Sequence, residues 1–290
     1  MATDFRLGIK TKEEYLDGAR LTYAPVILAL SNKEQHDFDF DRVKFREINV
    51  DKDSIVAEIL TKEATEKKHI KVRGRDKYFN VFAKGAKIIK SMRDGNVDLQ
   101  KVHNSVLREY SIMFDGDGLH GDGGNNGLLV SSDPDYVTNN SHEIPAASGN
   151  GFNRVQDVNS VVISLKTQVS ELTGSSAIKV FVYGKALTAF LGTITEDNET
   201  SVLEILKRTF PAADFIEVPA LVTPATDGDG FIVVSDDMTT LHYTSEPTIK
   251  NQGTNEEDEY YYANYAMGSL QVQPDTYGAI IKQPITFAAG

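Results

Sequence analysis

The sequence has no cysteine, no long apolar run and no excess of positive charge. The missing cysteines exclude disulfides, thiolate zinc sites and cysteine nucleophiles, and they fit an intracellular origin. No stretch reaches the roughly 18 to 20 consecutive apolar residues that a membrane-spanning helix needs. Residues 1–10 also lack the cationic segment and apolar run of a signal peptide. We therefore expect a soluble, unexported chain with no membrane partner.

Acidic residues outnumber basic ones. The 42 Asp and Glu against 30 Lys and Arg give a formal net charge of -12, so we do not expect the protein as a whole to coat nucleic acid or an anionic membrane. A chain of 290 residues is long enough for one large domain or two ordinary ones. It can bury a sizeable core without cross-links.

Enzyme motifs are also missing. The six histidines include no His-Glu-x-x-His pair, and no Gly-x-Ser-x-Gly elbow occurs, so neither zinc hydrolysis nor serine acyl transfer is predicted. We assign no catalytic residue and no cofactor.

A segment rich in glycine and aspartate follows the first predicted long helix. Its aspartates Asp115, Asp117 and Asp122 are hard oxygen ligands, but Leu119 and Asn126 stand where a calcium loop of the EF-hand type needs further ligands. The segment also lacks the lysine and Ser/Thr pair of a phosphate-binding loop. We expect a glycine loop that links a helix to the next strand, without a metal.

Hydrophobic spacing predicts two long amphipathic helices. The first follows cap-type residues at 96–98, and its predicted core face consists of Leu99, Val102, Val106, Tyr110 and Met113. The second is expected to pack on a sheet and to end at Gly174, and its stripe consists of Val155, Val158, Val162, Leu165, Val169 and Leu172.

The second half of the chain alternates strand and helix signals. A short helix is expected at 185–191, and a capping box at Ser201 and Glu204 opens a helix that Pro211 ends. The predicted strands are 178–183, 215–218, 231–234, 269–272 and 278–282.

The first 49 residues contain one compact apolar run, at 23–30, which predicts an extended arm with a single anchoring point. Residues 46–78 then read as two strands that return on each other. Acidic residues dominate the outgoing strand, and the basic residues of the return include Lys67, Lys68, Lys71 and Arg73. The charges indicate either ion pairs across one hairpin or a hairpin whose edges pair with neighbouring chains.

Two stretches carry a family resemblance. In residues 82–129 a helix runs into a Gly-Asp-like turn, and Gly127-Leu128-Leu129 follows; a second stretch combines 181–183, 201–211 and 215–217. In these residues and in the order of its elements, the chain resembles the major capsid proteins of tailed bacteriophages, the Hong Kong ninety-seven capsid fold that encapsulin shells share. Val130 stands where the family usually has asparagine.

The resemblance implies an α+β fold. Its parts would be an N-terminal arm, an extended β-hairpin loop, a peripheral domain with a long spine helix at 153–173, and an axial domain. The corresponding ranges are 1–45 for the arm, 46–78 for the hairpin, 79–174 with 261–290 for the peripheral domain, and 175–260 for the axial domain.

The resemblance implies a structural function. The chain would assemble with itself into homo-pentamers and homo-hexamers of an icosahedral shell that encloses the double-stranded DNA of a phage. It would be a virion protein assembled in the cytoplasm of the bacterial host, with portal, scaffold or decoration proteins as further candidate partners. An encapsulin-type compartment is the alternative within the fold. A cytosolic metal-dependent hydrolase that uses the loop from Asp115 to Asp122 is the alternative of another class.

Two sets of site residues follow from this interpretation. Lys67, Lys68, Lys71 and Arg73 would lie at a subunit interface. The connection 192–199 would face the capsomer axis and bring together copies of Glu196, Asp197 and Glu199, with the Asp-Gly-Asp-Gly turn at 227–230 as a competing axial candidate.

Overall fold

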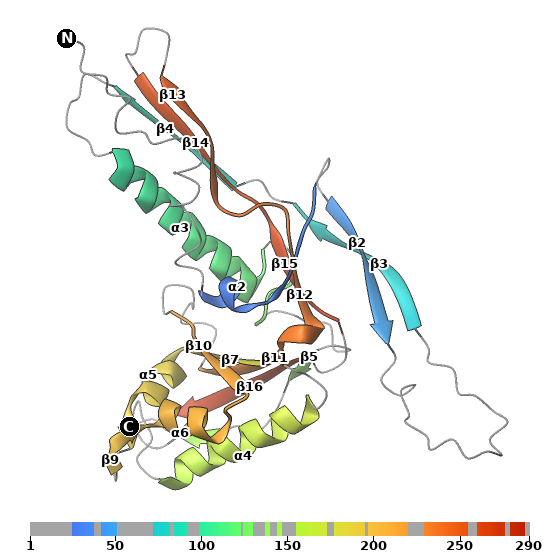
Figure 1. The fold of residues 1–290 in the computed structure, drawn as a ribbon, viewed down its shortest axis with the longest axis vertical. Coiled ribbons are helices and arrows are strands. Elements are labelled where there is room, and N and C mark those ends of the chain that lie inside the picture. The colour runs from blue at the N-terminus through green and yellow to red at the C-terminus, as the bar shows by residue number, and fades with distance from the viewer. Residues whose placement is uncertain are drawn as a thin grey trace, which may run out of the picture.

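The structure is a computed structural model of the chain. The residues that it describes are 25–37, 42–50, 72–81, 84–91, 99–122, 124–129, 137–139, 144–146, 155–172, 177–194, 197–219, 229–254, 260–275 and 279–287. Figure 1 shows three regions: a body built on a six-stranded sheet, an elongated body built along helix α3 (Leu99–His120), and a two-stranded hairpin at one side.

A six-stranded sheet forms the centre of the first body. Its order is β10-β7-β11-β16-β5, and β6 also pairs with β16. β7 and β10 are parallel, whereas β11 is antiparallel to both of its neighbours. The strands are β5 (Val137–Asn139), β6 (Ile144–Ala146), β7 (Ile178–Tyr183), β10 (Ala213–Glu217), β11 (Gly230–Ser235) and β16 (Ile280–Phe287).

Both faces of this sheet are buried. Val180 and Val182 of β7 face a hydrophobic cluster shared with three helices, while Phe181 and Tyr183 face a second cluster shared with the elongated body. Successive side chains of a strand point to opposite faces, so a strand buried on both sides needs a continuous apolar sequence. This explains the apolar run at 178–183, and the predicted strand there is confirmed.

Three helices cover one face of the sheet: α4 (Val155–Glu171), α5 (Lys185–Leu191) and α6 (Val202–Thr209). The short helix and the capping box predicted from the sequence are confirmed, because the Ser201 hydroxyl accepts a hydrogen bond from the Glu204 amide at 3.2 Å. Between α5 and α6 the chain forms a small antiparallel pair, β8 (Thr193–Ile194) and β9 (Asp197–Ser201), where a plain connection was expected.

Helix α4 packs on the sheet as its spacing predicts, but its buried face is shifted by one position. Val158 and Leu165 are buried, whereas Val162 is only half-buried and Val161 is fully buried. The polar Gln168 is also buried, because its side-chain amide donates to the Gln283 side chain of β16 at 2.7 Å. Because the Gln168 amide nitrogen is hydrogen-bonded, this polar residue can lie on the buried face of α4. Apolar spacing alone does not predict it.

The elongated body consists of α3 and an antiparallel sheet of order β13-β14-β4. Its strands are β4 (Lys84–Ser91), β13 (Thr248–Thr254) and β14 (Tyr260–Met267). Alternate residues of β14 are buried in the cluster shared with α3. His103 of α3 lies between the hydroxyls of Tyr261 and Tyr265. Burial lowers the pKa of His103, so the ring contacts the tyrosines as a neutral imidazole near pH 7.

Helix α3 differs from its sequence prediction in face and length. Its buried face includes His103, Leu107 and Phe114, whereas Met113, expected in the core, is 44% exposed. The helix also continues to His120, so the first half of the expected glycine loop is helical. The cause is tertiary: Leu119 is completely buried and Asp115 is bonded within the core, and these contacts outweigh the low helix propensity of the glycines.

A third sheet, of order β1-β12-β15, lies where the two bodies meet (Figure 1). Its strands are β1 (Asn32–Gln35), β12 (Thr239–Tyr243) and β15 (Leu270–Pro274), and a short 3₁₀ helix η4 (Asp236–Met238) precedes β12. Helix α2 (Pro25–Ala29) comes just before β1. Val26, Ile27 and Leu30 are buried in the hydrophobic cluster that the six-stranded sheet shares with the elongated body. The apolar run thus anchors the arm as expected, but it is helical, and the pairing of β1 with β12 adds a second attachment where a single one was expected.

The hairpin consists of β2 (Arg42–Val50) and β3 (Val72–Asn80), which pair without interruption from Arg42 opposite Asn80 to Val50 opposite Val72. The predicted pair of returning strands is confirmed there, beginning four residues before the expected start at 46. Its further part, 51–71, lies outside the described residues.

The packing groups some segments differently from the expected domain ranges. Helix α4 and strand β16, both expected in the peripheral domain, pack with β7, β10 and β11, which were expected in the axial domain. The physical reason is that β11 needs a partner on each edge, and β16 returns from the chain end to supply one. Among the described residues, no helix is long and apolar enough to cross a membrane.

The choice of buried face on α4 can be tested directly. Val161 is fully buried and Ile163, on the same helix, is 66% exposed. We expect Val161→Asp to lower the free energy of unfolding by at least about 3 kcal/mol or to abolish soluble folding, because it buries an unpaired carboxylate. Ile163→Asp is the matched control and should change stability by less than about 0.5 kcal/mol. Equal effects of the two substitutions in urea denaturation would show that the helix face is assigned wrongly.

Candidate functional site at the root of the hairpin

The hairpin leaves the rest of the molecule at its root, which we define as residues 42–43 and 79–81. Val43 and Phe79 are buried there in a small cluster with Val81. Farther along the hairpin, Lys44 and Tyr78 are exposed, Tyr78 by 55%. Within the described part of the hairpin, the root is therefore where the two strands pack against the rest of the same chain.

The end of α3 provides the surface that holds the root. Gly121 ends the helix with φ +76°, a conformation that favours glycine, and its amide donates to the Asp117 carbonyl at 2.6 Å. Residues 121–122 and 124–129 are called the α3 turn below. The amide of Leu128 donates back to the Gly118 carbonyl at 2.9 Å. A Cβ on Gly127 would lie 2.4 Å from the Gly121 nitrogen, so the α3 turn folds closely onto the helix end.

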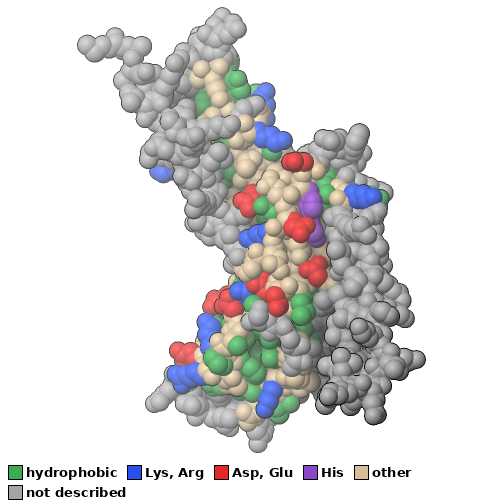
Figure 2. Space-filling view, turned by 45° about the vertical axis from the view of Figure 1, so that its right-hand side comes forward, with side chains coloured by type: hydrophobic (Ala, Val, Ile, Leu, Met, Phe, Trp, Pro, Cys, Tyr) green, Lys and Arg blue, Asp and Glu red, His purple; other side chains and the backbone are tan. Residues whose placement is uncertain are grey.

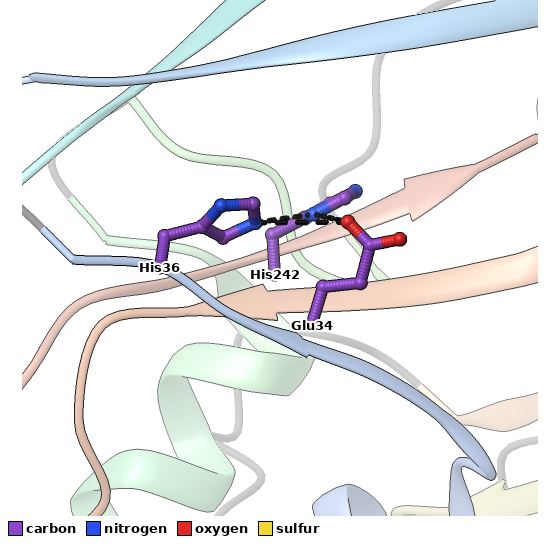
Figure 3. Close-up of side chains that lie close together, drawn as sticks. All are labelled: Glu34, His36 and His242. Atoms are coloured by element: carbon purple, nitrogen blue, oxygen red, sulfur yellow. Dashed lines mark hydrogen bonds and ion pairs between the residues drawn. The ribbon is translucent and has the colours of Figure 1, made fainter.

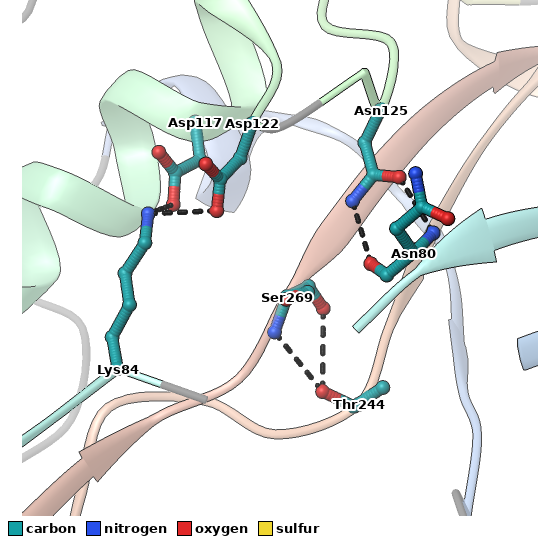
Figure 4. Close-up of polar contacts among 7 residues, drawn as sticks. All are labelled: Asn80, Lys84, Asp117, Asp122, Asn125, Thr244 and Ser269. Carbon is teal, nitrogen blue, oxygen red and sulfur yellow. Dashed lines mark hydrogen bonds and ion pairs between the residues drawn. The ribbon is translucent and has the colours of Figure 1, made fainter. Parts of the chain in front are cut away.

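Asn125 of the α3 turn binds the last residue of β3. Its side-chain oxygen accepts from the Asn80 amide at 2.8 Å, and its side-chain nitrogen donates to the Asn80 carbonyl at 2.8 Å (Figure 4). One side chain thus satisfies both backbone groups at the end of the strand, as a neighbouring strand would. Asn125 is buried, and the paired hydrogen bonds fix where β3 ends.

Lys84, the first residue of β4, lies between two carboxylates of the same region. Its ammonium group is 2.7 Å from Asp117 and 2.8 Å from Asp122 (Figure 4). Burial alone would lower the pKa of Lys84, but the hydrogen bonds and charges of the two aspartates outweigh it and raise this pKa. Burial raises the pKa of Asp117, and Lys84 counteracts this rise. The segment between β3 and β4 is thus held at both ends.

Further contacts attach the α3 turn to the other two sheets. The Lys282 ammonium group of β16 donates to the Leu129 carbonyl. The Val272 amide of β15 donates to the Asn126 carbonyl at 2.8 Å. Close by, the Ser269 amide donates to the Thr244 hydroxyl at 3.1 Å, which joins the connection after β12 to the connection before β15 (Figure 4).

Asp115 anchors the arm from within the core. Its side chain is fully buried, and one carboxylate oxygen accepts from the Ile27 amide of α2 at 2.8 Å. Burial raises the pKa of Asp115 to about 7, although the backbone amides of Ile27 and Val26 act in the opposite direction. The arm is therefore held by a carboxyl group that resists ionisation.

The three aspartates of the expected loop thus have separate structural partners. Asp115 binds α2, whereas Asp117 and Asp122 bind Lys84. This corrects the alternative in which the loop serves as a metal-binding active site, because Lys84 already neutralises two of the carboxylates and the third is buried against the arm.

Of the predicted interface and axial residues, the structure describes Arg73, Asp197 and Glu199. Lys67, Lys68, Lys71 and Glu196 fall outside the described residues. Arg73 is in β3, opposite Asn49 of β2. Asp197 and Glu199 are in β9, with Asp197 opposite Ile194 of β8.

The sequence did not predict the contacts at the root. Asn80 and Asn125 are 45 positions apart, and Lys84 and Asp117 are 33 apart. No motif links them. In the competing axial turn, Asp229 accepts from the Lys185 amide at 2.6 Å and so binds the start of α5.

Solved structures of similar fold cover nearly the whole chain. No protein-family model and no curated protein matches it. The capsid of Myoviridae phage XM1 matches with TM-score 0.61 and 13% identity over 90% of this chain and 91% of that one. A virus-like particle from Pyrococcus furiosus matches with TM-score 0.58 and 12% identity over 93% and 96%. The capsid of a native GTA particle matches with TM-score 0.57 and 13% identity over 92% and 91%.

The fold is therefore that of proteins that form capsids and virus-like particles. It is the mixed α and β Hong Kong ninety-seven capsid fold, and the resemblance found in the sequence is confirmed at the level of the fold.

The buried carboxyl group of Asp115 yields a pH test. Its pKa is raised in the folded chain, so the folded state binds more protons than the unfolded state between about pH 4 and 7. The contribution of Asp115 to the free energy of unfolding should therefore fall as pH rises through this window, by up to about 1.4 kcal/mol per pH unit.

We expect the stability difference between the wild type and Asp115→Asn to shrink or change sign from pH 5.5 to 7.5 in urea denaturation. Asp37→Asn, at an exposed position, is the matched control for the loss of one carboxyl group. A difference between wild type and Asp115→Asn that does not vary with pH would contradict a raised pKa at this site.

Proposed function

We propose that the chain is a major capsid protein, a structural subunit that assembles into pentamers and hexamers of an icosahedral shell around the DNA of a tailed phage. The observation that carries the proposal is the match to shell-forming proteins over about nine tenths of both chains. The proposed partner is a second copy of the same chain, in a virion, and no catalytic chemistry is assigned.

The hairpin is a second reason to propose that the chain assembles with itself. A two-stranded ribbon is marginally stable in water unless a further strand or core covers it. In the part whose burial is described, the buried residues Val43 and Phe79 lie at the root. We infer that a neighbouring subunit covers the remainder, and that the contacts of Asn125 and Lys84 set the direction in which the hairpin reaches it.

We propose a domain layout that follows the packing. The body with the six-stranded sheet and α4 to α6 would be the axial domain, and α3 with β13-β14-β4 would be the peripheral domain, with α3 as its spine helix. The sequence resemblance implied a spine helix at 153–173, which corresponds to α4. We propose α3 instead, because α4 packs with the helices around the six-stranded sheet.

Charge reversal tests the hairpin interface. We expect the change of Lys67, Lys68, Lys71 and Arg73 to Glu to leave a folded subunit but to block capsomers and shells at moderate salt, because a cationic edge could no longer attract an acidic neighbour. Sedimentation and negative-stain electron microscopy would measure assembly, and circular dichroism would measure folding.

A matched control variant makes the same total change in charge at positions outside the hairpin. It reverses four exposed basic residues, Lys101, Arg108, Lys166 and Lys250. If both variants lose assembly equally, net charge rather than the hairpin is responsible. Normal particles from the hairpin variant would exclude an electrostatic role for these four residues.

The β8-β9 connection is proposed to lie at the capsomer axis. Five or six copies of Glu196, Asp197 and Glu199 would then repel one another unless salt screens them or a cation binds. We expect added salt or divalent cations to stabilise capsomers, and Glu196→Gln, Asp197→Asn and Glu199→Gln together to remove most of this dependence. An unaltered salt response in sedimentation, or a particle map that puts β9 far from every axis, would contradict it.

An encapsulin-type compartment is the second candidate, favoured by the similarity to the virus-like particle. Particles isolated from the native cells would decide between the two. Double-stranded DNA inside them supports the capsid, whereas a protein cargo supports the compartment.

A further inference from the structure

Glu34 of strand β1 and His36, the residue after the end of β1, lie next to His242 of β12. The two strands are parallel, and Glu34 lies directly opposite His242. Residues two apart in a strand share a face, so His36 projects on the same side as Glu34. Figure 3 shows the three side chains converging from these two strands. Among the described residues, this is the group whose His and carboxylate donor atoms lie close enough to share a metal ion.

The distances suit a small metal ion. The His36 Nε2 and His242 Nδ1 atoms are 2.9 Å apart, and Glu34 Oε2 is 3.3 Å from His242 Nδ1 and 3.8 Å from His36 Nε2. Zinc bonds of 2.0–2.2 Å at tetrahedral angles separate their ligand atoms by about 3.3 Å. The observed distances fall on both sides of this value, so shifts of about half an ångström would form the site.

The backbone already holds the donors in place. The His36 amide donates to the Tyr243 carbonyl at 2.8 Å, which extends the ladder of β1 and β12. The Ser31 amide donates to the Asp236 carboxylate at 2.8 Å, before β1 begins. The His36 ring contacts the Phe79 ring of the hairpin root at a centroid distance of 5.9 Å. A site whose donors are positioned in advance spends little binding energy on ordering them.

Solvent can reach two of the three donor side chains, whereas His242 is buried. The Glu34 side chain is 58% exposed and that of His36 is 19% exposed, which leaves a route from solvent. Figure 2 shows histidine side chains at the surface in the middle of the molecule, with acidic side chains beside them.

We propose that Glu34, His36 and His242 bind one divalent transition-metal ion of the zinc class. Two imidazoles and one carboxylate are donors that suit Zn²⁺, Co²⁺ and Ni²⁺ rather than Ca²⁺ or Mg²⁺. The ion would exchange the hydrogen bond between the two histidines for a coordinate bond to each, and water completes its coordination. It would tie the arm to β12 beside the hairpin root, across 206 sequence positions.

The test uses the full chain in metal-free buffer at pH 7.5, with Zn²⁺ alone as the probe in calorimetry. We expect one site with a dissociation constant below about 10 µM, and a zinc-dependent rise of the unfolding temperature, because zinc binds the folded state. Co²⁺ should give the visible spectrum of a four-coordinate site with nitrogen and oxygen ligands.

Single substitutions assign the site. Glu34→Gln is at an exposed position and should keep the fold, which circular dichroism checks. We expect Glu34→Gln and His36→Ala each to weaken zinc binding at least about tenfold and to remove the thermal shift. His120→Ala, a half-buried histidine on α3, is the matched control. Unchanged affinity in both variants, or no zinc binding tighter than about 1 mM in the wild type, would overturn the proposal.

Discussion

The hydrogen bonds and ion pairs around the end of α3 hold together all the described regions of the molecule. Asn125 binds the end of the hairpin, Asp117 and Asp122 bind Lys84 at the start of β4, and Asp115 binds the arm. The α3 turn also accepts hydrogen bonds from β15 and β16. Because these groups are largely buried, losing one partner leaves another polar group unsatisfied, which makes the junction costly to deform.

The six-stranded sheet couples the two bodies in another way. β7 and β11 contribute one face to the core of α4, α5 and α6 and the other face to the core that contains α2, α3 and β14. Side chains in such a core are packed closely, so movement of one body against the other would disturb both clusters.

The hairpin and the arm differ in how the chain supports them. The arm is anchored twice, by the buried side chains of α2 and by the ladder between β1 and β12. The hairpin is anchored at its root, where Phe79 contacts the His36 ring of the arm. A change at β1 would therefore reach the root of the hairpin directly, and the Glu34, His36 and His242 group sits at this point of contact.

The sequence by itself determined those elements whose signals are local. The periodicity of α4, the capping box at Ser201, the apolar run of β7 and the anchor of the arm all follow from residues close together in the chain. The order of these elements was enough to indicate the fold.

Only the tertiary structure decided what depends on residues far apart. The extension of α3 through its glycines, the exposure of Met113 and the pairing of β16 with β11 depend on distant partners. The contact of Asn125 with Asn80 and the meeting of His36 with His242 join residues 45 and 206 positions apart. Local propensity contributes tenths of a kcal/mol per residue, so buried long-range contacts worth about 1 kcal/mol or more outweigh it.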